Sequence, residues 1–109
     1  MRSETHFRDV LDGPSGETVQ VDYRIATDRG RIIDFAINVT LLENGRRVDV
    51  YRVDTKHGHL HEQRFWMSPK PVRLDYGDYE TAFAAKRTEV MEKCARWARL
   101  LRESKTKKG

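Results

Sequence analysis

Residues 18–54, TVQVDYRIATDRGRIIDFAINVTLLENGRRVDVYRVD, decide the fold. Apolar residues occupy every second position over long runs of this stretch, which is the pattern of a β-strand with one buried face. Two turn signals, Asp28-Arg29-Gly30 and Asn44-Gly45, interrupt the runs, and glycine suits the left-handed backbone of such turns. The stretch therefore predicts three antiparallel strands at 18–27, 31–43 and 46–54.

A helix is expected after the strands. Residues 59–66 predict a fourth strand behind a turn that ends at Gly58. Prolines exclude a helix from the connector 67–77, whereas Asp78 suits the N-cap of a helix over 79–104. Burying the apolar stripe of this helix against the strands gives the α+β class, a four-stranded antiparallel meander sheet packed on one face by a long C-terminal helix. The stripe consists of Tyr79, Phe83, Val90, Cys94, Trp97, Ala98 and Leu101.

Length and composition fit one small domain. The chain has 109 residues, 35% of them charged, and a net charge of +4. We expect a flexible N-terminal arm at 1–16, a single α+β domain at 17–104 and a basic tail at 105–109. No apolar run reaches the length of a membrane span and no signal-peptide core is present, so a cytoplasmic location is expected. Cys94 is the only cysteine, which excludes a disulfide within one chain.

Turn lengths predict the register of the strands. A two-residue loop at Asn44-Gly45 aligns Leu41 with Val48, and a three-residue loop at 28–30 aligns Tyr23 with Phe35. A one-residue bulge at Gly58 would exchange the two faces of the fourth strand. Without that bulge, a polar group lies at the margin of the face that the helix covers, beside apolar residues of the first two strands. The polar group is Arg52, Asp54, His59 and His61, and its apolar neighbours are Tyr23, Phe35 and Ile37.

The candidate catalytic residues surround the third turn and are Arg52, Asp54, His57 and His61. An arginine can bind a phosphate through two hydrogen bonds, an aspartate can orient a histidine, and a histidine transfers protons near neutral pH. Enzymes that cleave RNA without a metal commonly use these residue types. One group deprotonates the 2′-hydroxyl and another protonates the leaving oxygen. The alternative is a structural polar network that finishes one end of the sheet.

A metal site is a weaker alternative in the same region. His59 and His61 stand two residues apart on a strand and share a face, where Asp54 could complete a zinc or nickel site. His57 precedes Gly58 in a turn, which directs its side chain elsewhere. We therefore expect neither a metal nor another cofactor.

The C-terminal end is strongly basic. Residues 93–109 hold seven lysines and arginines against one acid, Glu103. Such a surface attracts nucleic acid or an acidic protein. The alternative is a solvated helix end whose cations favour the helix dipole. The predicted nucleic-acid-binding residues are Arg64, Arg96, Arg99 and Arg102.

The string Arg52-x-Asp54-Thr55-x-His57-Gly58-x-x-His61 resembles a motif of the TumE-like toxins of toxin–antitoxin pairs. Asn44-Gly45 falls at the position of their hairpin, and residues 78–84 are similar to the start of their closing helix. The likeness spans roughly residues 33–100. It implies a sheet-plus-helix fold and a toxin-like action on RNA or translation.

Two functions follow as expectations. The first is a toxin-like, metal-independent endoribonuclease with RNA and an antitoxin protein as partners and a dimer as a plausible assembly. In it, Arg52 binds the phosphate, His61 or His57 moves the proton, and Asp54 orients a histidine. The alternative is a non-catalytic regulatory module that binds nucleic acid or protein. Neither function involves a membrane.

Overall fold

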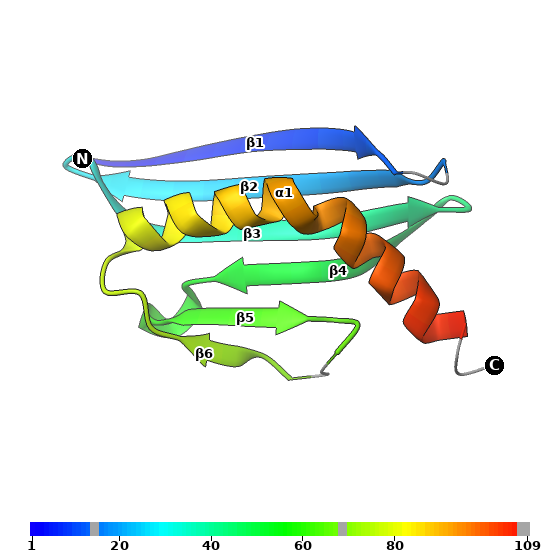
Figure 1. Cartoon of the computed structure of the whole chain (residues 1–109). Coiled ribbons are helices and arrows are strands. Elements are labelled where there is room, and N and C mark those ends of the chain that lie inside the picture. Colours follow the sequence, from blue (N-terminus) through cyan, green and yellow to red (C-terminus); the bar gives the residue numbers. More distant parts are fainter. Residues whose placement is uncertain (14–15, 68–69, 107–109) are drawn as a thin grey trace.

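The protein folds into one antiparallel sheet that is packed on one face by a long C-terminal helix (Figure 1). The computed structural model describes residues 1–13, 16–67 and 70–106, except for the side chains of His57, Lys105 and Thr106. Six strands lie side by side in the order in which they occur along the chain. The elements are β1 (Arg2–Asp12), β2 (Thr18–Asp28), β3 (Arg31–Glu43), β4 (Arg46–Asp54), the 3₁₀ turn η1 (Lys56–Gly58), β5 (Leu60–Arg64), β6 (Val72–Leu74) and α1 (Tyr79–Thr106).

The α+β class is confirmed, but the sheet has six strands rather than four. Residues 2–12, which the sequence predicts as part of a flexible arm, form β1 and pair with β2 over their whole length. Only Phe7, Asp9 and Leu11 turn partly inward, so β1 is an outer strand with most of its side chains in solvent and a faint apolar pattern. The connector contributes β6, in which Leu74 lies opposite Leu60 at the other edge of the sheet.

The helix supplies one half of the core. α1 crosses β2, β3 and β4, and the Asp78 carboxylate caps it by accepting a hydrogen bond from the Thr81 N–H at 2.7 Å, as predicted. Within the described part of the chain, no helix combines the length and the apolar character that crossing a membrane requires. The buried stripe of α1 consists of Ala82, Phe83, Val90, Cys94, Trp97, Ala98 and Leu101, and it packs on buried apolar residues of β2 to β5.

The first hairpin differs from the predicted register. Its loop has two residues, Arg29 and Gly30, whose φ angles are 54° and 77°. A bulge beside Ala26 and Thr27 then accommodates one extra residue of β3, so that Tyr23 lies opposite Ile37 instead of Phe35. Because the net shift is two residues, the apolar side chains of this hairpin keep their predicted face.

A second bulge reverses the faces of β4. Asn44 and Gly45 form the predicted two-residue loop, and Leu41 lies opposite Val48 as predicted. The register then shifts between Val39 and Thr40, which leaves one extra residue on β4 and places Val50 and Tyr51 both in the core. Beyond the bulge each side chain of β4 points to the face opposite the predicted one.

The predicted surroundings of Arg52 and Asp54 are therefore wrong. The sequence predicts them beside Tyr23, Phe35 and Ile37 under the helix, whereas they lie on the open face, opposite Asn38 and Ala36 of β3. Val53 takes the buried position instead. The sequence predicts Asp54 opposite His59 and Arg52 opposite His61, whereas Asp54 lies opposite His61 and Arg52 opposite Gln63, a shift of two residues. A shift of two residues leaves Arg52, Asp54 and His61 on a common face.

A charged cluster lies buried between α1 and the sheet, and the sequence does not predict it. Lys86 Nζ donates a hydrogen bond to Glu62 Oε2 at 2.7 Å, although the two residues are only 4% and 8% exposed. The Tyr51 hydroxyl donates to the same oxygen at 2.5 Å, and Arg64 Nε donates to Glu62 Oε1 at 3.1 Å. Glu89 also accepts a hydrogen bond from Lys86 at 3.1 Å. The cluster thus gives each buried charge an opposite partner, without which burial would be costly.

These contacts hold both Glu62 and Lys86 in their charged forms. Burial alone would raise the pKa of Glu62, but hydrogen bonds from Lys86 and Tyr51 outweigh burial and lower that pKa. Burial alone would lower the pKa of Lys86, and the hydrogen bond to Glu62 reverses this and raises it. Burial and the bond to Glu62 raise the pKa of Tyr51, so its hydroxyl keeps the proton that it donates.

We expect acid to weaken the fold through Glu62. A carboxyl with a lowered folded-state pKa contributes stability above its unfolded pKa, and this contribution is lost as the pH falls through the folded value. The contribution of Glu62 is therefore complete above its ordinary pKa of 4.5 and is lost at lower pH. Urea denaturation between about pH 3 and 7 measures this, and Glu62→Gln should flatten the dependence of the unfolding free energy on pH.

Glu92→Gln is the matched control for this measurement, because Glu92 is exposed on α1. This variant should follow the wild-type pH dependence. If Glu62→Gln also followed the wild-type pH dependence, Glu62 would not be the group through which acid weakens the fold.

Candidate functional site

The open face of the sheet carries two rows of polar side chains that run across the strands. The residues of each row lie directly opposite one another in the paired strands. Ala36 is the one small residue among them, and it stands at the centre of the sheet. The first row is His6, Arg24, Ala36, Asp54, His61 and Arg73, and the second is Arg8, Asp22, Asn38, Arg52 and Gln63.

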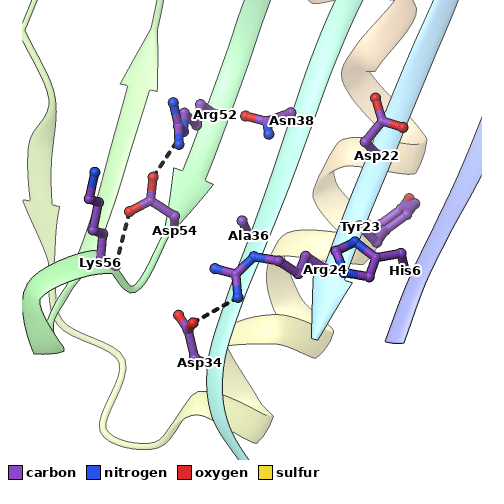
Figure 2. A pocket seen from close by; sticks show the side chains of 10 residues that line it. All are labelled: His6, Asp22, Tyr23, Arg24, Asp34, Ala36, Asn38, Arg52, Asp54 and Lys56. Carbon is purple, nitrogen blue, oxygen red and sulfur yellow. Dashed lines mark hydrogen bonds and ion pairs between the residues drawn. The ribbon is translucent and has the colours of Figure 1, made fainter. Parts of the chain in front are cut away.

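A pocket of about 460 Å³, here called the central hollow, lies over Ala36 (Figure 2). Its charged walls are held by ion pairs, Arg24 to Asp34 at 2.7 Å and Arg52 to Asp54 at 3.0 Å. The hollow is lined by His6, Asp22, Tyr23, Arg24, Asp34, Ala36, Asn38, Arg52, Asp54 and Lys56.

Backbone anchors fix the side of the hollow next to η1. The buried Thr55 hydroxyl donates to Asp34 Oδ1 at 2.5 Å and accepts a hydrogen bond from the Phe35 N–H at 2.9 Å. Asp54 accepts a hydrogen bond from the Lys56 N–H at 3.1 Å in addition to its ion pair with Arg52. The carboxylates of this wall therefore have set orientations.

Hydrogen bonds keep the carboxylates of Asp34 and Asp22 ionised. The hydrogen bond from Arg24 lowers the pKa of Asp34 despite burial, and the Thr55 hydroxyl adds to this effect. Burial alone would raise the pKa of Asp22, but hydrogen bonds from Arg8 and Gln20 lower it. The hollow thus presents fixed negative and positive groups side by side.

A second pocket of about 220 Å³, here called the corner pocket, adjoins the hollow at the β4–β5 end. It shares Arg52, Asp54 and Lys56 with the hollow. His61 lines it, and the buried Nε2 of His61 has no hydrogen-bond partner in the described part of the chain. The His59 ring lies beside that of His61, with 4.1 Å between the ring centroids. The remaining lining residues are Glu62, Gln63 and Pro71.

Three of the four predicted catalytic residues meet at the corner pocket, namely Arg52, Asp54 and His61. The fourth, His57, has a side chain that lies outside the described part of the structure. The Asp54 carboxylate contacts the Arg52 guanidinium and the Lys56 N–H, so its observed partner is the arginine. In this geometry Asp54 positions Arg52.

The predicted nucleic-acid-binding arginines lie away from this pocket. Arg64 points to the helix side of the sheet, where its guanidinium lies 5.6 Å from the centroid of the Trp97 ring. Arg102 forms ion pairs with Glu17 at 3.0 Å and with Glu43 at 3.3 Å. Arg96 and Arg99 are exposed on α1. These arginines thus lie on α1 or toward it, whereas the corner pocket opens on the other face of the sheet.

The weak metal alternative gains no third ligand from the side chains that the structure describes. His59 and His61 lie side by side, but no cluster of three or more His, Cys, Asp or Glu side chains suited to a metal occurs among the described residues.

Sequence reasoning missed most of the central hollow. His6 was assigned to the arm, yet it lies on β1 at the wall of the hollow, with its Nε2 2.8 Å from Glu4 Oε1. Asp22 and Arg24 occupy the polar positions of the alternation in 18–27, and the same alternation would have placed them on the face opposite Tyr23. The detectable signal was therefore the polar half of a pattern whose apolar half predicted the strand.

Comparison with known proteins identifies a family but no function. Neither the curated proteins nor the solved structures contain a match to the chain. One family model, described as a domain of unknown function (DUF7718), matches residues 1–105. Since the match takes in both the sheet and nearly all of the helix, the chain belongs to the DUF7718 family.

Proposed function

We propose that the protein is a toxin-like, metal-independent endoribonuclease whose active site is the corner pocket. The observation that supports this most directly is the convergence of Arg52, Asp54 and His61 on one pocket. The buried Nε2 of His61 has no hydrogen-bond partner among the described residues. A cation, a carboxylate and an imidazole are the groups that phosphodiester transesterification uses. The likeness of the 52–61 string to TumE-like toxins agrees with this proposal.

The chemistry assigns one task to each group. His61 takes the proton of the 2′-hydroxyl, whose oxygen attacks the adjacent phosphorus. The bond from phosphorus to the 5′ oxygen breaks, which leaves a 2′,3′-cyclic phosphate and a 5′-hydroxyl. The proton for the leaving oxygen comes from a protonated imidazole, either that of His57, as the sequence predicts, or that of His59, whose ring lies beside that of His61. Arg52, held by Asp54, stabilises the negative charge on the phosphoryl oxygens.

The basic outer surface of α1 serves a different partner in this proposal. Arg96 and Arg99 are exposed on α1, which packs on the face of the sheet opposite the corner pocket. They suit an acidic protein, such as an antitoxin, that docks on the helix side.

A non-catalytic binding module is the second candidate. The observation in its favour is that the charged groups of the open face already neutralise one another, as in the Arg24–Asp34 and Arg52–Asp54 pairs. A surface of this kind can recognise a nucleic acid or a protein without chemistry.

Cleavage of end-labelled RNA tests the proposal. His61→Ala and Arg52→Ala should each lower the cleavage rate by about a hundredfold, because each removes a group that acts on the transition state. A chelator should leave the wild-type rate unchanged. Expression of the wild type should arrest growth, and expression of His61→Ala should not.

Arg96→Ala is the matched control, since it removes another exposed arginine and should retain the wild-type rate within a few fold. Circular dichroism confirms the fold of each variant. Wild-type protein that binds RNA without cleaving it would exclude the endoribonuclease and favour the binding module.

A further inference from the structure

We infer that the central hollow is a nucleotide subsite, which holds the base and ribose next to the phosphate that the corner pocket cleaves. This inference rests on the proposed function for its substrate. It adds a binding site and a ligand class that Arg52, Asp54 and His61 alone do not define.

The hollow exists because Ala36 is small. In its row, Arg24 and Asp54 flank it on the neighbouring strands, and Asp34 and Asn38 flank it along β3 on the same face. All four neighbours are longer than alanine, so their side chains form walls around a floor made by one methyl group (Figure 2). The resulting 460 Å³ lies within the range of pockets that bind small ligands.

The charges of the hollow favour a ligand that carries both hydrogen-bond donors and acceptors over a simple anion. Arg24, Arg52 and Lys56 supply positive charge, but Asp22, Asp34 and Asp54 line the same space. The carboxylates would repel a bare phosphate that sat at the centre. A nucleobase suits this lining, because its edge carries both hydrogen-bond donors and acceptors, and the Asn38 amide can match either kind.

The position of the hollow fits one nucleotide of a bound strand. Arg52, Asp54 and Lys56 belong to both pockets, so a ligand in the hollow has its phosphate side next to Arg52. Ala36 on β3 and His61 on β5 are two strands apart, which corresponds to roughly 10 Å. The exposed His6 imidazole stands at the opposite wall, where it can stack against a base.

Titration with the four nucleoside monophosphates, followed by NMR or calorimetry, tests the subsite in the full chain. Ala36→Leu fills the floor with a larger side chain that points away from the core, and it should weaken binding of the preferred nucleotide at least tenfold. Ribose 5-phosphate, which lacks a base, should bind both proteins weakly and alike. Ala36→Ser keeps the hollow open and should bind as the wild type does.

Ala85→Leu is the matched control, because it makes the same substitution at an exposed position of α1. Asn38→Ala is a second test that does not change the floor, and it should weaken binding of the nucleotides relative to ribose 5-phosphate. The subsite is disproved if no nucleotide saturates the wild type, or if Ala36→Leu and Asn38→Ala both bind nucleotides as tightly as the wild type.

Cleavage measured on the same variants separates this inference from the proposed function. Unchanged nucleotide binding in both Ala36→Leu and Asn38→Ala, with RNA cleavage retained, would disprove the subsite and leave the nuclease standing. Nucleotide binding that depends on Ala36 in a protein that never cleaves RNA would disprove the nuclease and support the subsite.

Discussion

Replacing Lys86 with methionine is expected to lower the free energy of unfolding by about 3 kcal/mol. The substitution removes the ammonium group that donates to Glu62 Oε2 at 2.7 Å and leaves a buried carboxylate behind. The expected loss is at the lower end of the cost of breaking a buried ion pair, because Tyr51 and Arg64 still donate to Glu62. Urea denaturation at neutral pH measures it.

The double variant Lys86→Met with Glu62→Leu provides the decisive comparison. Removing both charges should recover most of the stability that the single substitution loses, because the uncompensated carboxylate is then gone. Lys93→Met is the control, since Lys93 is half exposed and its 3.9 Å contact with Glu89 contributes little. Additive losses in the double variant would contradict this account of the cluster.

Replacing Trp97 with alanine should destabilise the protein by about 3–5 kcal/mol. Trp97 is 3% exposed and stacks on Tyr51, with the ring centroids 4.3 Å apart. Its other neighbours are Trp66, at 5.5 Å between centroids, and the Arg64 guanidinium. The substitution therefore leaves a cavity between α1 and β4 and removes the apolar cover of the charged cluster. Thermal or urea denaturation gives the change in stability.

Trp66→Ala is the matched control, because Trp66 contacts the same ring from a half-buried position. It should cost clearly less than Trp97→Ala, and Trp97→Phe should retain much of the stability. If Trp66→Ala were as harmful as Trp97→Ala, the packing of Trp97 under the helix would not be the main source of the effect.

The parts of the fold that were predictable depend on local patterns. Asn44-Gly45 fixes a two-residue turn through its own backbone preferences, so the alignment of Leu41 with Val48 was predicted and is confirmed. Asp78 and the helical spacing of the apolar residues likewise predicted α1 and its cap. Each of these signals lies within a few residues of the feature that it specifies.

The features that were missed depend on tertiary packing. The bulge opposite Val39 and Thr40 appears in the sequence only as two consecutive apolar residues, Val50 and Tyr51, where the alternation changes phase. Lys86 has the character of a surface residue in an amphipathic helix, and only the approach of Glu62 from the sheet explains its burial. The position of the bulge depends on the pairing of β3 with β4, and the burial of Lys86 depends on the contact of α1 with β5. Neither feature follows from the sequence of one segment alone.

The sequence predicted that Arg52, Asp54 and His61 lie together, but it placed them on the wrong face of the sheet. Arg52, Asp54 and His61 remained together because the β4–β5 register differs from the predicted one by two residues, which preserves the face of each side chain. Their side of the sheet was wrong because the bulge adds a single residue, which reverses it. The hollow next to them was missed because residues 2–12 lack the apolar alternation of a half-buried strand, so nothing in the sequence placed His6 opposite Arg24.

The outer strand β1 also bears on whether copies of the chain can add to the sheet. An eleven-residue strand at the border of a sheet is a template on which another chain could add a strand and begin a fibril. β1 carries Arg2, Glu4, Arg8, Asp9 and Asp12, so an incoming strand would have to accept charges of both signs along its whole length. The polar residues that leave β1 without an apolar alternation therefore also disfavour the addition of another strand at this edge.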